Sequence, residues 1–381
     1  MGAIPALLIH CSIGTVYCWS LLRNSIAESL NCSASDVEWA FSLAIFFLGM
    51  SAAFAGNLVE KNVKRSALLS SICFFIGMFG TGLSIEYGSL AGVLIFYGLI
   101  MGIGLGVGYL TPVKTLMMWF SNNKGLATGI AITGFGLAKV IASPIIAKLL
   151  LSIPVSKIFY ILGIVYLAMM LLGALLIKKP KSNLNLAGNS FNFKDGLTFI
   201  KNKKFVAIWA VFFINITCGL ALISQEKSLL MACGMGASVT SVSSLTAFFN
   251  SFGRLGYSSW SDVFKDRSVI YIVIFLLSTY VCLFCGSIPA VILIVTTLIV
   301  CNAGYGGGFS TLPSMLSDKF GLKNVSVIHG YALSAWAFAG LVGNHLGNFM
   351  LGSYGVQALL ITLSIIYFVG FLITLFYVRG K

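Results

Sequence analysis

Two basic side chains lie inside long apolar stretches of this sequence, where the chemistry open to them is the binding of an anion. Arg254 precedes Asp262 by eight positions, which places it about 12 Å along a helix from that loop residue. Lys139 lies near the middle of an earlier stretch. Charged groups at membrane depth are costly and usually face a cavity, a partner or a substrate. Both residues are therefore candidate substrate-binding groups.

Arg254 has polar neighbours on its own helix face. Asn250 and Ser258 stand four positions before and after it, which predicts a face that lines a cavity rather than lipid. A guanidinium is always charged and grips a carboxylate through two parallel hydrogen bonds. We therefore interpret Arg254 as an anion anchor. The alternative is a structural arginine that pairs with Asp262 to hold an inner gate.

Lys139 shares one side of its helix with the small residues Gly125, Gly129 and Gly136. Small residues mark the face of a membrane helix that packs against its neighbours, so Lys139 is expected to point into the bundle. The hypothesis is that it supplies a second positive charge to the substrate. The alternative is a lysine bonded to backbone carbonyls or water at a kink near Pro144.

Acidic residues, unlike Arg254 and Lys139, do not fall clearly inside any predicted span. The nearest lie at loop edges. A cation site or a carboxylate proton relay needs an acid at membrane depth, so this pattern argues against cation efflux and sodium coupling. Two inward cations without a counter-ion favour an anionic substrate. We find no constellation of paired acids, serine with histidine, or metal ligands at that depth, so catalysis, a metal and a cofactor are not expected.

The composition requires a polytopic membrane protein. The 381 residues are 58% hydrophobic and 9% charged, and a span of about 20 apolar residues crosses the bilayer. We expect an all-α integral membrane protein with about twelve transmembrane helices in two pseudo-symmetric six-helix bundles, residues 1–177 and 205–381, joined by a cytoplasmic central loop at 178–204. The spans are predicted near residues 4–22, 37–59, 66–85, 90–118, 125–151, 158–177, 205–224, 237–260, 268–286, 289–314, 326–350 and 356–378.

The net charge of +14 comes from basic residues whose positions indicate the membrane topology. Lysine and arginine gather in alternate loops, which by the positive-inside tendency places both termini and the central loop in the cytoplasm. A multi-pass location in the cell membrane, plasma or inner, is therefore predicted, and no nucleic-acid partner is expected.

One loop pattern occurs in each half of the sequence. Glu60 precedes Arg65 by five positions, and Asp262 precedes Arg267 by the same spacing. Parallel six-span repeats place a binding site near the midplane, between the halves. We assign the four residues to a cytoplasmic gate that holds one state and releases it during turnover.

The loop Gly56-x-Leu-x-Glu60-Lys-x-x-Lys64-Arg65 and a series of span motifs carry a family resemblance. The span motifs include Tyr17-x-Trp19-Ser20, Gly104-x-Gly106-x-Gly108-Tyr109, Gly134-Phe135-Gly136-Leu137, Gly253-Arg254, Gly304-Tyr305 and Asp318-x-Phe320-Gly321. Together they resemble the major facilitator superfamily and, within it, the oxalate/formate antiporter family and its monocarboxylate-transporter-like relatives. The loop departs from the usual pattern at Glu60, where Asp is common, and at Val63, where Gly is common.

This resemblance implies an essential substrate-binding arginine at Arg254. It also implies that a lysine used by the oxalate transporter of the family corresponds to Trp336 here, which favours monocarboxylates over oxalate. Tyr17, Tyr109, Tyr305 and Trp336 lie in spans that line the pathway of the superfamily, where their flat faces and polar edges suit a small carboxylate. Asn302 is expected to add a hydrogen bond.

The function predicted from these observations is secondary transport of small organic carboxylate anions by alternating access. Monocarboxylates and dicarboxylates such as oxalate both stay open. Competing interpretations are a carboxylate-sensing receptor that does not transport and a transporter of another small anion. The expected partners are a small carboxylate and the lipid bilayer, and a monomer is the expected oligomeric state.

Overall fold

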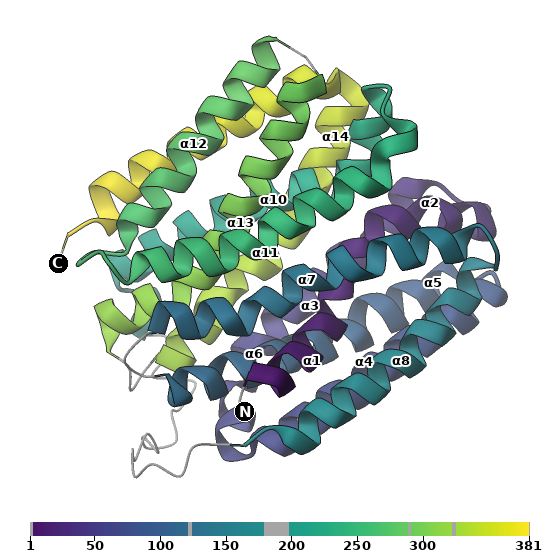
Figure 1. Ribbon diagram of the computed structural model, residues 1–381, viewed down its shortest axis with the longest axis horizontal. Helices are drawn as coiled ribbons and strands as arrows, with labels where there is room; N and C mark the ends of the chain where they lie inside the picture. Colours follow the sequence, from purple (N-terminus) through teal and green to yellow (C-terminus); the bar gives the residue numbers. More distant parts are fainter. Residues whose placement is uncertain (1–2, 121–123, 179–197, 289–290, 322–324, 381) are drawn as a thin grey trace.

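The computed structural model describes residues 3–120, 124–178, 198–288, 291–321 and 325–380, and these residues form helices joined by short turns (Figure 1). Helices are the expected outcome for apolar segments, because lipid offers the backbone no hydrogen-bond partners and each segment must satisfy its own N–H and C=O groups. Within the described residues, ten helices are long and apolar enough to cross a membrane.

The first half of the chain supplies six crossings. The first crossing is continuous from Ile4 to Leu30, although its middle tightens into a 3₁₀ turn. The fourth likewise joins three consecutive elements. The elements of this half are α1 (Ala3–Ile13), η1 (Gly14–Cys18), α2 (Trp19–Leu30), α3 (Ala34–Lys61), α4 (Val63–Glu86), α5 (Leu90–Val93), η2 (Leu94–Met101), α6 (Gly102–Trp119), α7 (Lys124–Leu150) and α8 (Val155–Leu176).

The second half supplies the other six crossings. The long segment α14 consists of two helices joined at Gly355, whose φ is +82°. The chain turns there, so α14 crosses the membrane twice. Asn250, Arg254 and several serines make α11 more polar than its neighbours, although its 23 residues suffice to cross. The elements are α10 (Lys203–Ala232), η3 (Gly236–Ser238), α11 (Val239–Ser261), α12 (Ser268–Ser287), α13 (Val291–Phe320), α14 (Val325–Ile373) and η4 (Thr374–Val378). The prediction of a twelve-helix membrane fold is confirmed.

The helices of the two halves gather in two groups, which Figure 1 separates by colour into purple-to-teal and green-to-yellow. The groups meet where α7 packs on α11 and where α3 packs on α14. The proposed domain limits, 1–177 and 205–381, remain predictions, and most of the expected central loop lies outside the described residues.

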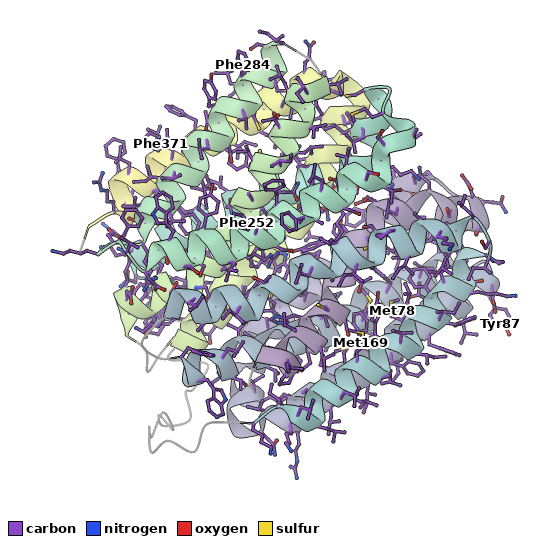
Figure 2. The ribbon with its side chains drawn as sticks, viewed as in Figure 1. Met78, Tyr87, Met169, Phe252, Phe284 and Phe371 are labelled. Atoms are coloured by element: carbon purple, nitrogen blue, oxygen red, sulfur yellow. The ribbon has the colours of Figure 1, made fainter. Side chains whose placement is uncertain are left out.

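Apolar side chains cover the outer surface of the helices (Figure 2). Phe252 on α11 is 61% exposed and Phe284 on α12 is 43% exposed. Such residues are stable on a surface that lipid covers, since hydrocarbon is as apolar as they are. Polar groups with a function must therefore lie between the helices.

One predicted boundary is wrong in a way that matters. The seventh span was expected near 205–224, but α10 continues to Ala232 and carries Gln225 and Glu226 within it. Leu229 and Leu230, which follow the polar residues, are buried and keep the last turns packed in the bundle. An acidic side chain therefore does lie inside a membrane-spanning helix, contrary to the prediction.

Candidate substrate-binding site

Arg254 lies at the centre of the interface between the two groups of helices. Its side chain is 1% exposed, and its Nε donates a hydrogen bond to Asn250 Oδ1 at 2.8 Å, one turn away on α11. The guanidinium lies over the rings of Phe135, Tyr305 and Phe309, at 5.6, 5.9 and 5.3 Å from their centroids. Its Nη2 has no hydrogen-bond partner among the described residues. A buried charged donor in this condition is suited to receiving an anion.

Two glycines bring neighbouring helices close enough to form this site. A Cβ on Gly306 of α13 would lie 2.2 Å from the carbonyl oxygen of Asn250 and 2.9 Å from Arg254 Cγ. A Cβ on Gly136 of α7 would lie 2.2 Å from Ser251 Oγ. Glycine at these two positions lets α7 and α13 pack closely against α11. Their residues Phe135 and Phe309 therefore lie against Arg254.

The predicted aromatic residues gather around the same point. The hydroxyls of Tyr17 on η1 and Tyr305 on α13 are hydrogen-bonded at 2.5 Å across the two halves. Trp336 on α14 lies 4.4 Å from Phe309 and 5.4 Å from Tyr109 between ring centroids. The indole Nε1 of Trp336 and the hydroxyl of Tyr109 have no hydrogen-bond partner within the described part of the chain. The site therefore combines one guanidinium, apolar ring faces and unused polar groups.

A small cavity of about 10 Å³ lies one residue away from Arg254 and has room for about one water molecule. Asn250, the partner of Arg254, lines this cavity, as do Tyr17, Lys139 and Asn302. Asn302 donates its Nδ2 hydrogen bond to Leu298 O at 2.9 Å, within its own helix. The structure thus brings together the predicted residues Arg254, Lys139, Tyr17, Tyr305 and Asn302.

Lys139 has a buried acidic partner that was not expected from the sequence. Its Nζ forms a buried ion pair with Glu226 Oε2, with side-chain exposures of 4% and 0%. The statement that the inward cations have no protein counter-ion is therefore wrong for Lys139, and its bond is to a carboxylate rather than to backbone carbonyls. Sequence reasoning missed Glu226 because it placed this residue beyond the end of its helix. The role of Lys139 in substrate binding stays a prediction.

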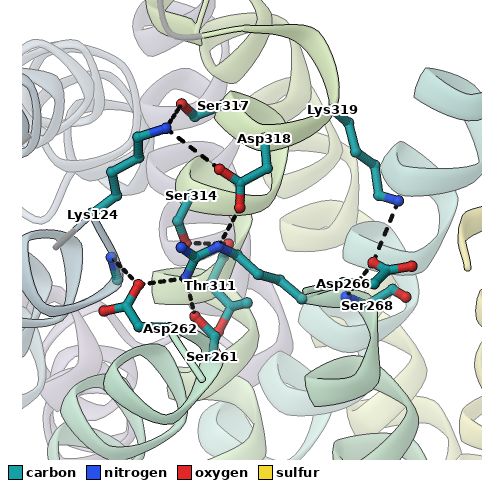
Figure 3. Close-up of polar contacts among 12 residues, drawn as sticks. Lys124, Ser261, Asp262, Asp266, Ser268, Thr311, Ser314, Ser317, Asp318 and Lys319 are labelled. Carbon is teal, nitrogen blue, oxygen red and sulfur yellow. Dashed lines mark hydrogen bonds and ion pairs between the residues drawn. The ribbon is translucent and has the colours of Figure 1, made fainter. Parts of the chain in front are cut away.

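One end of the bundle carries Lys124, Asp262 and Arg267 and is here called the basic end. There Lys124, at the start of α7, contacts Asp318 of α13 in the other half (Figure 3). Asp262 accepts hydrogen bonds from the backbone N–H of Gly125 at 3.1 Å and of Leu126 at 3.2 Å. A carboxylate on the first turn of a helix is stabilised by the unpaired N–H groups there. Asp262 thus holds the start of α7 across the interface.

Arg267 completes the contacts at the basic end. Its Nη1 lies 2.7 Å from Asp262 Oδ1, and its Nε lies 2.5 Å from Asp318 Oδ2 on α13. Lys124 crosses the interface to Ser317 at 2.9 Å and to Asp318 at 3.4 Å. Asp262 binds Arg267 and the start of α7 rather than Arg254, and the assignment of Asp262 and Arg267 to a gate stays a prediction. The sequence motif contained Asp318, but no role had been inferred for it.

The matching pair of the first half is described only in part. Arg65 forms part of the first turn of α4, where its backbone N–H donates to Asn62 Oδ1 at 3.0 Å. The side chain of Glu60 lies outside the described residues. The assignment of Glu60 and Arg65 to a gate therefore remains a prediction.

The opposite end of the bundle holds a second network between the halves that sequence reasoning missed. Arg23 on α2 pairs with Glu38 on α3 at 3.1 Å, and it also donates to Gln225 at 3.2 Å and to Ser228 at 2.9 Å, both on α10. Arg23 was expected just beyond the first span, but α2 continues through it to Leu30. Contacts between the halves are therefore present at both ends of the bundle.

These features define a multi-pass membrane transporter with a central, enclosed polar site. A family model described as the Major Facilitator Superfamily matches residues 6–344, and the chain belongs to this superfamily. The resemblance stated from the sequence motifs is thereby confirmed, and transport rather than catalysis is the activity of this class.

Relatives and a solved structure agree with this assignment. An uncharacterized transporter of the superfamily, YhjX of Escherichia coli K12, is 29% identical over 336 residues, which cover 86% of this chain and 82% of the relative. The oxalate:formate antiporter of Oxalobacter formigenes is 25% identical over 393 residues, with 98% and 90% covered. The xylose transporter XylE from Escherichia coli, in a partially occluded inward-open conformation, superposes with a TM-score of 0.74 at 13% identity, with 100% and 97% covered.

Proposed function

We propose that this transporter moves small organic carboxylate anions across the cell membrane by alternating access. The observation that carries the proposal is the buried guanidinium of Arg254, whose Nη2 has no partner among the described residues. A carboxylate that accepts hydrogen bonds from this group would neutralise its charge, and the surrounding rings would contact the small organic remainder. One relative is named as an oxalate:formate antiporter, and both of these acids belong to the same chemical class.

Tyr17, Tyr109, Tyr305 and Trp336 are proposed to surround the substrate, together with Asn302. The unused hydrogen-bonding groups of Tyr109 and Trp336 are suited to a second carboxylate oxygen or to a polar substituent. The rings pack against one another, and the cavity lined by Asn250 is only about 10 Å³. A substrate of only a few heavy atoms fits this arrangement better than a large one, once the rings move apart.

In the proposed cycle, the two ends open alternately. The distribution of lysine and arginine supports a cytoplasmic location for the basic end and for both chain termini. Opening toward the cytoplasm would separate Asp262 from the start of α7, and opening outward would separate Arg23 from α10. A monomer suffices for this cycle, because the site lies between the two halves of one chain.

Counterflow in proteoliposomes tests the proposal. Vesicles are loaded with an unlabelled acid, formate, pyruvate, lactate or oxalate, and uptake of the same labelled acid is followed, with the corresponding neutral amides as matched competitors. Uptake that acids inhibit and amides do not would support a carboxylate carrier. Saturable binding of an acid without counterflow would instead support a non-transporting receptor. The absence of both from folded protein would contradict the proposal.

A further inference from the structure

We propose that Glu226 sets the charge class of the substrate: by neutralising Lys139, it leaves one net positive charge at the central site and so selects monoanions over dianions. This inference rests on the proposed transport of carboxylates, and it assigns to Glu226 a positioning and selectivity role rather than direct contact with the substrate.

The first support is the set of contacts that Glu226 makes. Its Oε2 accepts from Lys139 and from Ser243 Oγ, the latter at 3.0 Å, and its Oε1 accepts from Thr246 Oγ1. Ser243 and Thr246 are both buried on α11, so the carboxylate is enclosed on α10 by donors from two other helices. Three donors stabilise the negative charge of a buried carboxylate. The ion pair between Glu226 and Lys139 is therefore held in place by the surrounding side chains.

The second support is the place of the pair relative to the proposed substrate site. Lys139 lines the small central cavity with Asn250, and Asn250 accepts the hydrogen bond from Arg254 Nε. Tyr17 lines the same cavity and bonds to Tyr305, one of the rings beneath the guanidinium. Lys139 thus borders the cavity directly, and Arg254 is one hydrogen-bonded residue, Asn250, away from it.

The charges around this cavity give the selectivity. Among the described residues that line the cavity or bond to a residue that does, Arg254 contributes one positive charge, while Lys139 and Glu226 cancel. A monocarboxylate neutralises the remaining charge, whereas a dianion leaves one negative charge uncompensated in a site closed from water. An uncompensated buried charge is strongly unfavourable, because the low dielectric of the interior screens it poorly.

Replacement of Glu226 by glutamine keeps the size of the side chain and a carbonyl acceptor but removes the negative charge. Lys139 then carries an uncancelled charge beside the cavity, and the site holds two positive charges, which suit a dianion. A matched control is Glu38→Gln. It makes the same change in another buried ion pair, that of Arg23, and neither Arg23 nor Glu38 lines the cavity.

The experiment compares initial rates of counterflow for pyruvate and for oxalate in proteoliposomes that contain equal amounts of folded protein. For Glu226→Gln we expect the oxalate-to-pyruvate ratio to rise at least about tenfold, the change that about 1.4 kcal/mol of differential binding produces. For the double variant Lys139→Met/Glu226→Gln, which returns the site to one positive charge, we expect the wild-type ratio. For Glu38→Gln we expect the ratio to stay unchanged.

Three results would overturn the inference: an unchanged ratio in Glu226→Gln, an equal rise in Glu38→Gln, or a wild type that carries oxalate as fast as pyruvate. If Glu226→Gln does not fold, Lys139→Met replaces it as the single variant. It leaves Glu226 unpaired and should lose pyruvate uptake, which the double variant should restore; failure to restore it in folded protein would also overturn the inference. A wild type that carries neither acid contradicts the proposed function itself, before any variant is compared.

Discussion

At the scale of single residues, the central site depends on one arginine whose surroundings are mostly aromatic. The rings of Phe135, Tyr305 and Phe309 hold the guanidinium by cation–π contact and exclude water from it. Asn250 accepts a hydrogen bond from Arg254 Nε, while the Nη2 of the same arginine, which has no partner among the described residues, is available to a ligand. The affinity of such a site depends on the few additional donors around it.

Trp336→Phe tests one of these donors. The substitution keeps an aromatic ring beside Phe309 but removes the indole Nε1–H, which has no partner among the described residues. Because a hydrogen bond to a charged group contributes about 1.5–3 kcal/mol, we expect the KM for the carboxylate to rise roughly tenfold or more. The measurement is the concentration dependence of counterflow.

The control for this variant is Trp209→Phe. Trp209 donates its Nε1–H to Ser334 Oγ at 2.9 Å, and it is only partly buried on α10. An equal rise in KM in both variants would show that a lost indole hydrogen bond acts through general packing, and it would contradict a substrate contact at Trp336.

At the scale of helices, the site exists because glycines let α7 and α13 approach α11. Gly306→Ala would place a methyl group 2.2 Å from the backbone oxygen of Asn250, a contact that only a shift of α13 can relieve. Overpacking of this kind typically costs about 1–3 kcal/mol. We expect a lower thermal midpoint in detergent and a loss of counterflow, since Tyr305 and Phe309 of α13 would move away from Arg254.

Gly256→Ala is the matched control, on α11 itself. The added methyl group would lie 3.8 Å from Phe252 Cε1, which is ordinary contact. This variant should keep the wild-type midpoint and rate. A Gly306→Ala protein as stable and active as Gly256→Ala would contradict the role of close helix approach at the site.

The sequence predicts elements better than it predicts pairs of side chains. Apolar length determines where a chain crosses a membrane, so the spans and the twelve-helix fold could be predicted without a structure. Arg254 could be found because a charged residue within an apolar stretch can be recognised from the sequence alone. The partner of Lys139 could not, since Glu226 is 87 positions away and lies near a helix end whose boundary was predicted two turns too early.

At the scale of the whole molecule, two unlike networks join the halves. Ion pairs at the basic end join Asp262, Arg267, Asp318 and the start of α7, whereas Arg23 bonds α10 at the opposite end. In the proposed cycle, breaking either network would expose the site on that side only, so their relative strengths would set the distribution between inward-facing and outward-facing states. A single charge at one end should therefore shift this distribution.

Asp262→Asn tests the basic end. The amide removes the ion pair with Arg267 and can no longer accept with both oxygens from Gly125 and Leu126. We expect the state open at the basic end to become more populated. In protein whose native cysteines are replaced, a cysteine at the buried position Ser314 of α13 should then be alkylated several-fold faster.

Asp266→Asn is the control at the same end. Asp266 bonds Ser268, Lys319 and Gly380, which all belong to the second half of the chain. Within the part of the chain that the structure describes, its loss breaks no contact between the halves. Equal acceleration of alkylation by both substitutions would contradict the assignment of Asp262 to a gate between the halves.

The most direct test of the account is counterflow of labelled carboxylate by wild type, Arg254→Gln and Lys148→Gln. Lys148 lies in the last turn of α7, away from the central site, and its substitution changes the net charge by the same amount. The account predicts uptake by wild type and Lys148→Gln and a loss of at least about a hundredfold in Arg254→Gln, because removal of a charge-assisted pair costs about 3 kcal/mol or more. Full uptake by folded Arg254→Gln would contradict the claim that this arginine binds the transported anion.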